Sequence, residues 1–212
     1  MDSSICPYIN KSGITYKQYK IDIVKEIFRK SIHICSSLVP FFLKLFYIPT
    51  ICVLTVALIF YTVSEIARLN GKNIPLISQI TAIAARKRDE NKFVLGPVTL
   101  VLGILAASLV WNLKAASIGI YALAFGDGLA SLAGKLFGQI RIPCTQGKTV
   151  AGSLTCFTAI FISCYLTCHD CKTALIIATV GMFIELLPLK DFDNILIPVL
   201  LGGLSQNLIL GF

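Results

Sequence analysis

Residues 115–137 read AASIGIYALAFGDGLASLAGKLF, a stretch that is almost wholly apolar and contains one acid, Asp127, and one base, Lys135. An α-helix needs about 20 apolar residues to cross a bilayer, so this stretch predicts a transmembrane helix. Pro40 and Lys44 interrupt the first of six further apolar segments, which spans the bilayer alone or forms a kinked pair with the second. The six segments are residues 31–46, 48–67, 93–110, 150–167, 173–189 and 195–210.

The composition of the whole chain also indicates a membrane protein. Only 14% of its 212 residues are charged, and its mean hydropathy is +0.80, whereas a soluble domain carries about 25% charged residues. The net charge of +8 does not indicate a nucleic-acid partner, because the basic residues lie between apolar runs and form no stripe with interleaved aromatic residues. We predict an all-α, polytopic membrane bundle of about seven transmembrane helices, with residues 1–30 as a cytoplasmic N-terminal segment and residues 31–212 as a single transmembrane domain.

The lysine and arginine residues predict the orientation, because cytoplasmic loops carry an excess of them. With the N-terminus in the cytoplasm, only Lys44, Lys114 and Lys172 of the 19 basic residues fall outside. The acids near the predicted helix ends follow the same side, and ionisable groups within apolar sequence indicate function. Those on the cytoplasmic side are Glu26, Glu65, Asp127, Glu185, Asp191 and Asp193. This pattern predicts one charged site at the cytoplasmic membrane surface, suited to a phosphorylated ligand.

The longest polar stretch, residues 68–92, contains apolar residues at helical spacing, from Leu76 to Ile83. This spacing is typical of an interfacial helix that lies on the lipid headgroups, although an ordinary solvated loop fits it equally well.

The most informative polar segment is residues 126–153, GDGLASLAGKLFGQIRIPCTQGKTVAGS. Gly126 and Gly128 flank Asp127, and glycines allow a ligand or a second backbone to approach closely. A carboxylate here suits Mg²⁺, which binds few carboxylates together with phosphate oxygens. In a second reading, the glycines only pack helices together.

The second half of this segment resembles a phosphate-binding site. A lysine, hydroxyl groups and glycines stand where the next helix begins, and helix N-termini bind phosphate. Its spacing does not match a Walker A motif, and Lys148 would also be expected here simply as a cytoplasmic lysine. The residues in question are Arg141, Gly147, Lys148, Thr149, Gly152 and Ser153.

Three further groups of charged residues lie at predicted cytoplasmic helix ends. The first places Glu26, Lys30 and His33 on one helical face, with Arg29 beside them. The second is Glu65 with Arg68, which could equally be a local ion pair. In the third, an acid precedes the last apolar segment and a proline lies inside it. Its members are Glu185, Asp191, Asp193, Asn194 and Pro198.

Together these four motifs, in this order, resemble the CTP-dependent lipid-alcohol kinases, which include dolichol kinase, phytol kinase, the CTP-using diacylglycerol kinase and bacterial diacylglycerol or polyprenol kinase homologues. The resemblance spans nearly the whole chain. It implies that residues 31–212 form a catalytic domain in which the hydroxyl of a membrane lipid attacks the γ-phosphate of CTP, giving a phosphorylated lipid and CDP.

The resemblance also implies roles for individual residues. Asp127 would hold Mg²⁺, with Glu185 or Asp193 as further ligands. Lys148 and Arg141 would bind phosphates, helped by Thr149 and Ser153. His33 and Asp193 are alternative general bases, and general bases work best when their pKa is near the ambient pH. The remaining expected site residues are Gly126, Gly128, Gly152, Arg29, Lys30 and Arg68 for the nucleotide, with Glu26, Glu65 and Asn194 in support.

Two other functions share some of these features. A phosphatidate cytidylyltransferase has a similar Gly-Asp element, but the His-Gly-Gly and closing Asp-Arg of that family do not occur here. A transporter would need ionisable residues near the bilayer midplane, whereas the ionisable residues of this chain are predicted at one membrane surface. Diacylglycerol and a polyprenol both present a hydroxyl at headgroup level, so the sequence leaves the acceptor open, as it does the oligomeric state. The resemblance implies the cytoplasmic membrane of a bacterium or the endoplasmic reticulum of a eukaryote.

Overall fold

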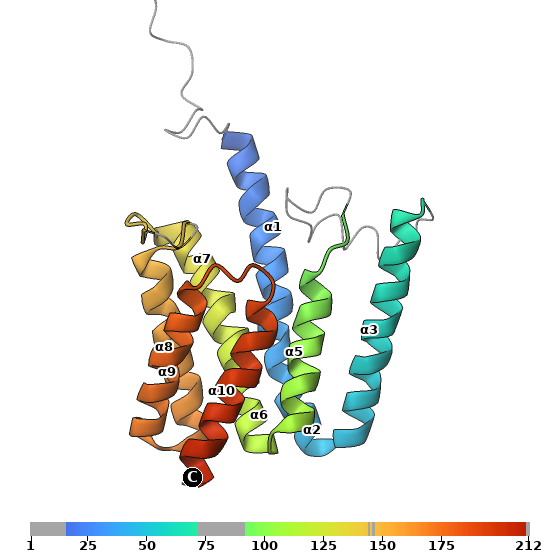
Figure 1. Cartoon of the computed structure of the whole chain (residues 1–212). Helices are drawn as coiled ribbons and strands as arrows, with labels where there is room; N and C mark the ends of the chain where they lie inside the picture. The colour runs from blue at the N-terminus through green and yellow to red at the C-terminus, as the bar shows by residue number, and fades with distance from the viewer. Residues whose placement is uncertain (1–15, 72–91, 144, 146, 211–212) are drawn as a thin grey trace, which may run out of the picture.

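The computed structural model describes residues 16–71, 92–143, 145 and 147–210, which form a bundle of helices lying side by side (Figure 1). The predicted all-α class is confirmed for these residues, while the interfacial helix expected near residues 76–83 lies outside them. The helices in chain order are α1 (Tyr16–Cys35), the 3₁₀ turn η1 (Ser36–Leu38), α2 (Val39–Leu45), α3 (Tyr47–Leu69), α5 (Gly96–Val110), α6 (Leu113–Tyr121), the π-helical turn η3 (Ala122–Asp127), α7 (Gly128–Phe137), α8 (Val150–Cys168), α9 (Cys171–Leu186) and α10 (Asp193–Leu210).

Three helices of the described residues are long and apolar enough to cross a membrane, namely Tyr47–Leu69, Leu113–Phe137 and Val150–Cys168. Most apolar side chains of α3 are exposed, which suits a helix that faces lipid. The chain is therefore an integral membrane protein. The count of about seven spans and the cytoplasmic N-terminus remain predictions.

The segment predicted at residues 31–46 is not one helix. α1 begins well before it, so the expected boundary between residues 30 and 31 lies inside α1. The turn η1 then interrupts the helix, and α2 follows with Pro40 in its first turn. Proline has no N–H to donate there and is favoured where a helix starts. A kinked connection thus leads from α1 through α2 into α3.

Small residues let the central helices pack closely. A Cβ on Gly103 of α5 would lie 2.1 Å from the Asn194 carbonyl oxygen of α10, and one on Gly119 of α6 would lie 2.2 Å from the Pro198 carbonyl oxygen. Asn194 also donates from Nδ2 to Thr99 Oγ1 of α5 at 3.0 Å. The first turns of α10 are therefore fixed against α5 and α6, which positions Asp193 at the start of α10 and Asp191 just before it.

Glu65 ties α3 to the residues before α5. Its side chain is fully buried and accepts two hydrogen bonds from Arg68, at 2.7 and 2.8 Å, and one from the Val94 N–H at 2.9 Å. Arg68 also donates to the Lys92 carbonyl oxygen at 2.9 Å. The local ion pair considered for these two residues is thus present, and it serves to join two segments.

We expect Glu65→Ala to lower the thermal unfolding temperature in detergent, because it leaves the buried Val94 N–H without its acceptor and removes two of the hydrogen bonds that Arg68 donates. The unsatisfied buried N–H alone costs about 1–3 kcal/mol. Lys92→Ala is the matched control, since it keeps the carbonyl oxygen that Arg68 uses. An unfolding temperature for Glu65→Ala equal to that of Lys92→Ala would contradict this role.

Candidate functional site

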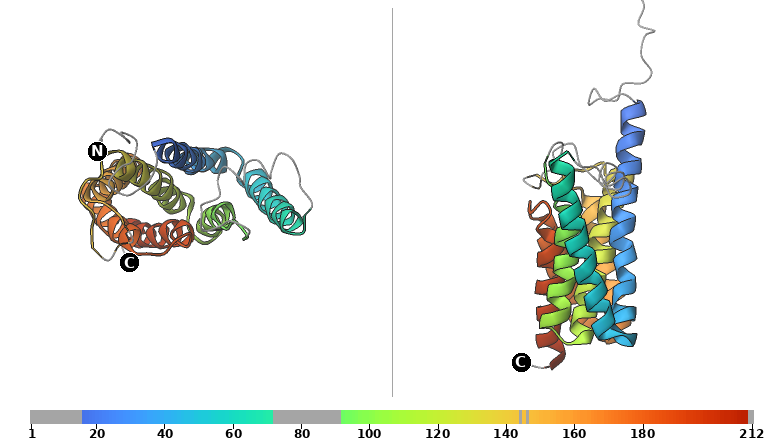
Figure 2. Two further views of the ribbon diagram at one scale, coloured as in Figure 1. Left: turned by 90° about the horizontal axis from the view of Figure 1, so that it is seen from above. Right: turned by 90° about the vertical axis from the view of Figure 1, so that its right-hand side faces the viewer.

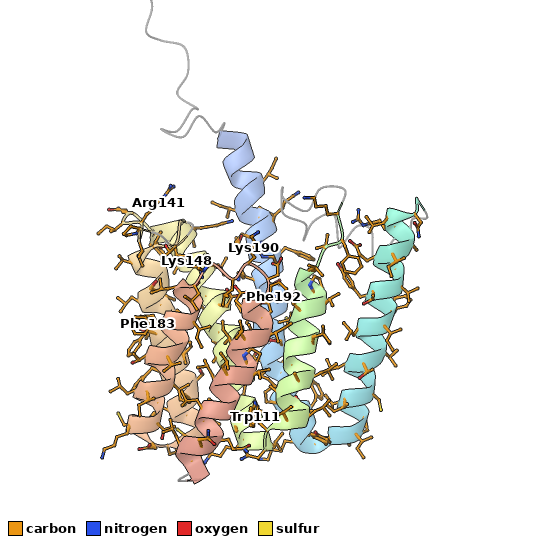
Figure 3. The ribbon with its side chains drawn as sticks, viewed as in Figure 1. Trp111, Arg141, Lys148, Phe183, Lys190 and Phe192 are labelled. Carbon is orange, nitrogen blue, oxygen red and sulfur yellow. The ribbon has the colours of Figure 1, made fainter. Side chains whose placement is uncertain are left out.

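The charged residues of interest lie at one end of the bundle. Figure 3 shows Lys148 and Lys190 at this end and Trp111 at the other. The second half of α1, the junction between α7 and α8, the end of α9 and the start of α10 all meet here (Figure 1). Lys44, Lys114 and Lys172 lie instead in α2 and at the starts of α6 and α9, at the opposite end.

Asp127 forms the centre of the site. It ends the π-helical turn η3, and such turns inside α-helices are frequent at functional sites. Lys30 Nζ of α1 lies 2.5 Å from Asp127 Oδ2, and His33 Nδ1 lies 3.1 Å from the same oxygen. All three side chains are buried. Buried charges persist when they are paired, so this contact fixes α1 against the middle of the chain.

A second ion-pair group lies nearby. Glu26 Oε2 accepts from Lys135 Nζ of α7 at 2.6 Å, and the carboxylate also pairs with Arg29. Burial raises the pKa of Glu26, but the charges of Arg29 and Lys135 hold it below its usual value. Sequence reasoning missed Lys135, although it lies about two helical turns after Asp127 on the same helix.

Lys148 connects the loop before α8 to the last turn of α9. Its Nζ lies 2.9 Å from Glu185 Oε1 of α9, close to where that helix ends. The next residue, Thr149, caps α8 by accepting from the Gly152 N–H at 3.2 Å, while Ser153 donates to the Thr149 carbonyl oxygen. The predicted phosphate-binding segment therefore lies at the start of a helix, and its lysine contacts Glu185 in the site.

Three adjoining cavities surround these ion pairs. The central cavity contains all three acids predicted as metal ligands, and its charged lining residues are Lys30, Asp127, Lys148, Glu185, Lys190 and Asp193. The α8 cavity, at the start of that helix, is lined by residues that include Arg29, Lys135, Lys148, Thr149, Gly152 and Ser153. The α5 cavity shares Lys30, Asp127 and Asp193 with the central cavity. Segments far apart in sequence thus meet in one charged depression.

Some predicted residues lie away from these cavities. A Cβ on Gly126 would lie 2.8 Å from Ile160, and one on Gly128 would lie 3.1 Å from Ile34, so both glycines allow helix packing. Arg141 pairs with Thr149 in a single antiparallel bridge and is exposed. Arg68 is engaged by Glu65, as described above. None of these four residues lines the three cavities.

The donor groups fit a magnesium ion only with help from a ligand. Among the described residues, no three His, Cys, Asp or Glu side chains stand close enough to hold a metal. Asp127 and Glu185 are also each paired with a lysine. However, Asp127, Glu185 and Asp193 supply carboxylate oxygens to one cavity, and Mg²⁺ commonly takes one or two carboxylates and completes its shell with phosphate oxygens and water.

Comparison with known proteins finds relatives but no family model that matches this chain. No solved structure matches it. The chain is 27% identical over 194 residues to the uncharacterized protein MJ1137 of Methanocaldococcus jannaschii, covering 87% of this chain and 94% of that one. It is 30% identical over 150 residues to phytol kinase 1 of Arabidopsis thaliana, covering 62% of this chain and 49% of that kinase.

Other named relatives are also lipid-alcohol kinases. Dolichol kinase of Saccharomyces cerevisiae is 29% identical over 116 residues, which cover 52% of this chain and 22% of that protein. CTP-dependent diacylglycerol kinase 1 of Eremothecium gossypii is 29% identical over 89 residues, or 42% of this chain and 28% of that protein. The named kinases are the family that the sequence motifs resemble, which confirms the resemblance. The chain spans half or less of each of these kinases.

Proposed function

We propose that this protein transfers the γ-phosphate of CTP to the hydroxyl of a membrane lipid alcohol, at the cytoplasmic surface of its membrane. The observation that carries the proposal is the convergence of Asp127–Lys30 and Lys148–Glu185 on one cavity at a single end of an apolar bundle. Phosphoryl transfer requires mainly positioning and charge stabilisation, and this cavity supplies both signs of charge within reach of the lipid surface.

The α8 cavity is the proposed site of the phosphate chain. Lys148, Lys135 and Arg29 supply positive charge along its lining. The N-terminus of α8 adds the partial positive charge of the helix dipole, which favours phosphate. When phosphates bind, Lys148 would exchange its Glu185 partner for a phosphate oxygen. The anion would then occupy the position that the Glu185 carboxylate holds.

Asp127 and Asp193 would hold Mg²⁺ together with phosphate oxygens. When bound, this ion neutralises charge on the β- and γ-phosphates. Lys30 pairs with Asp127 and holds its side chain in place. The lipid oxygen forms a bond to the γ-phosphorus while the bond to the β-phosphate oxygen breaks and CDP leaves. The hydroxyl proton passes to His33 or Asp193, both of which line the α5 cavity.

The reaction is tested with purified protein, Mg²⁺ and CTP labelled at either the α- or the γ-phosphate, together with diacylglycerol, a polyprenol or phytol in detergent micelles. We expect label to reach lipid from γ-labelled CTP alone. Label from α-labelled CTP, with phosphatidic acid as acceptor, would instead identify a cytidylyltransferase. Parallel reactions with ATP, GTP and UTP test the choice of nucleotide, and we expect CTP to be the preferred donor.

A further inference from the structure

The α5 cavity differs from its two neighbours because apolar side chains make up much of its lining. Ile32 of α1 and Pro97 and Leu100 of α5, together with Val94, form this apolar part of the lining. The charged residues Lys30, Asp127 and Asp193 also line the cavity, and it shares them with the central cavity. A cavity lined by both apolar and charged residues suits an amphipathic ligand, whereas apolar side chains add nothing to the binding of a nucleotide's phosphates.

The helices on either side of this cavity are not closely packed together. Among the described residues, α1 packs mainly on η3 and α7, while α5 packs on α3, α6 and α10. In the view from above, α1 and α5 lie on opposite sides of the bundle (Figure 2). Among the described residues, a ligand that enters between α1 and α5 would therefore break no close packing of these two helices on each other.

We infer that the α5 cavity is the acceptor site, which receives the hydroxyl and the first carbons of the lipid alcohol from the bilayer between α1 and α5. This inference rests on the proposed kinase function and adds where its second substrate binds. Lys30, Asp127 and Asp193 mark the transfer point because they line both the acceptor side and the nucleotide side. His33 lines only the α5 cavity of the three, which places it beside the acceptor hydroxyl.

The inference makes Leu100 a specificity-determining residue that contacts the lipid. Leu100 is 4% exposed and lines the cavity, whereas Leu102 on the same helix is 40% exposed and does not. Leu100→Trp fills the space beside the apolar part of the α5 cavity lining. We therefore expect the KM for the lipid alcohol to rise about tenfold or more, with the KM for CTP unchanged. Leu102→Trp, the matched control, should leave both constants at wild-type values.

A second measurement uses the wild-type protein and does not depend on how the variant folds. A lipid alcohol with a photoreactive diazirine near its hydroxyl is crosslinked in micelles, and the labelled peptides are mapped by mass spectrometry. We expect label on α1 or α5 near residues 32 and 94–100. Label confined to α8 and α9, or a Leu100→Trp variant with an unchanged KM for lipid, would overturn the acceptor site. Wild-type protein that transfers no γ-phosphate would instead overturn the proposed function itself.

Discussion

Asp127→Asn is expected to lower kcat for lipid phosphorylation by about 10²–10³-fold, the usual cost of removing one electrostatic group from a transition state. Asparagine keeps the size of the side chain but loses the charge that pairs with Lys30 at 2.5 Å and that would hold Mg²⁺. The measurement is γ-phosphate transfer from CTP to lipid, with protein that elutes from size exclusion as wild type does.

Asp170→Asn is the matched control for this change. Asp170 caps α9 at the opposite end of the bundle by accepting from the Thr173 N–H at 2.8 Å, and asparagine caps helices equally well. We expect this variant to keep wild-type activity. Activity of Asp127→Asn within about threefold of wild type would contradict the central role of this carboxylate, because loss of a charged hydrogen-bond partner costs more than that.

Lys148→Met is expected to raise the KM for CTP by about 10–100-fold, because a charge-assisted hydrogen bond to phosphate contributes about 1.5–3 kcal/mol. Methionine keeps much of the aliphatic length of the side chain and removes only the charge. The KM for the lipid alcohol should change little, since Lys148 lines the central and α8 cavities and not the α5 cavity.

Two control variants test whether the effect on the KM for CTP is specific to Lys148. Lys172→Met removes a lysine at the opposite end, and we expect no change in either constant. Arg141→Met removes a residue that sequence reasoning assigned to phosphate but that lies outside the three cavities, so its KM for CTP should stay near wild type. A larger effect for Arg141→Met than for Lys148→Met would show that the phosphates bind over the loop instead.

The sequence predicted the helical class and several helix positions because apolar runs of bilayer length leave few alternatives. The helix predicted at residues 115–137 is Leu113–Phe137 in the structure. The break in the first segment was visible at Pro40, although the early start of α1 at Tyr16 was not, since residues 16–30 carry no long apolar run. The π-helical turn at Asp127 has no sequence signature comparable to a proline.

Within the site, the sequence indicated which residues are charged but not which of them pair. Lys30 and Asp127 are 97 residues apart, and only the packing of α1 on η3 brings them together. Glycine has two uses, close helix packing and close ligand approach, and a sequence does not separate them. Gly126 and Gly128 serve packing, whereas Gly152 does both: a Cβ on it would lie 2.9 Å from the Ala130 carbonyl oxygen of α7, and the residue lines the α8 cavity.

Photolabelling with 5-azido-CTP tests most directly whether the nucleotide binds where these charges converge. The wild-type protein in detergent is irradiated with Mg²⁺ and the analogue, with and without excess CTP, and labelled peptides are identified by mass spectrometry. The predicted result is CTP-protected label on residues 131–153 or 185–193, two segments that contribute lining residues to the central and α8 cavities. CTP-protected label confined to the opposite end, around residues 111–114 or 168–172, would contradict the account.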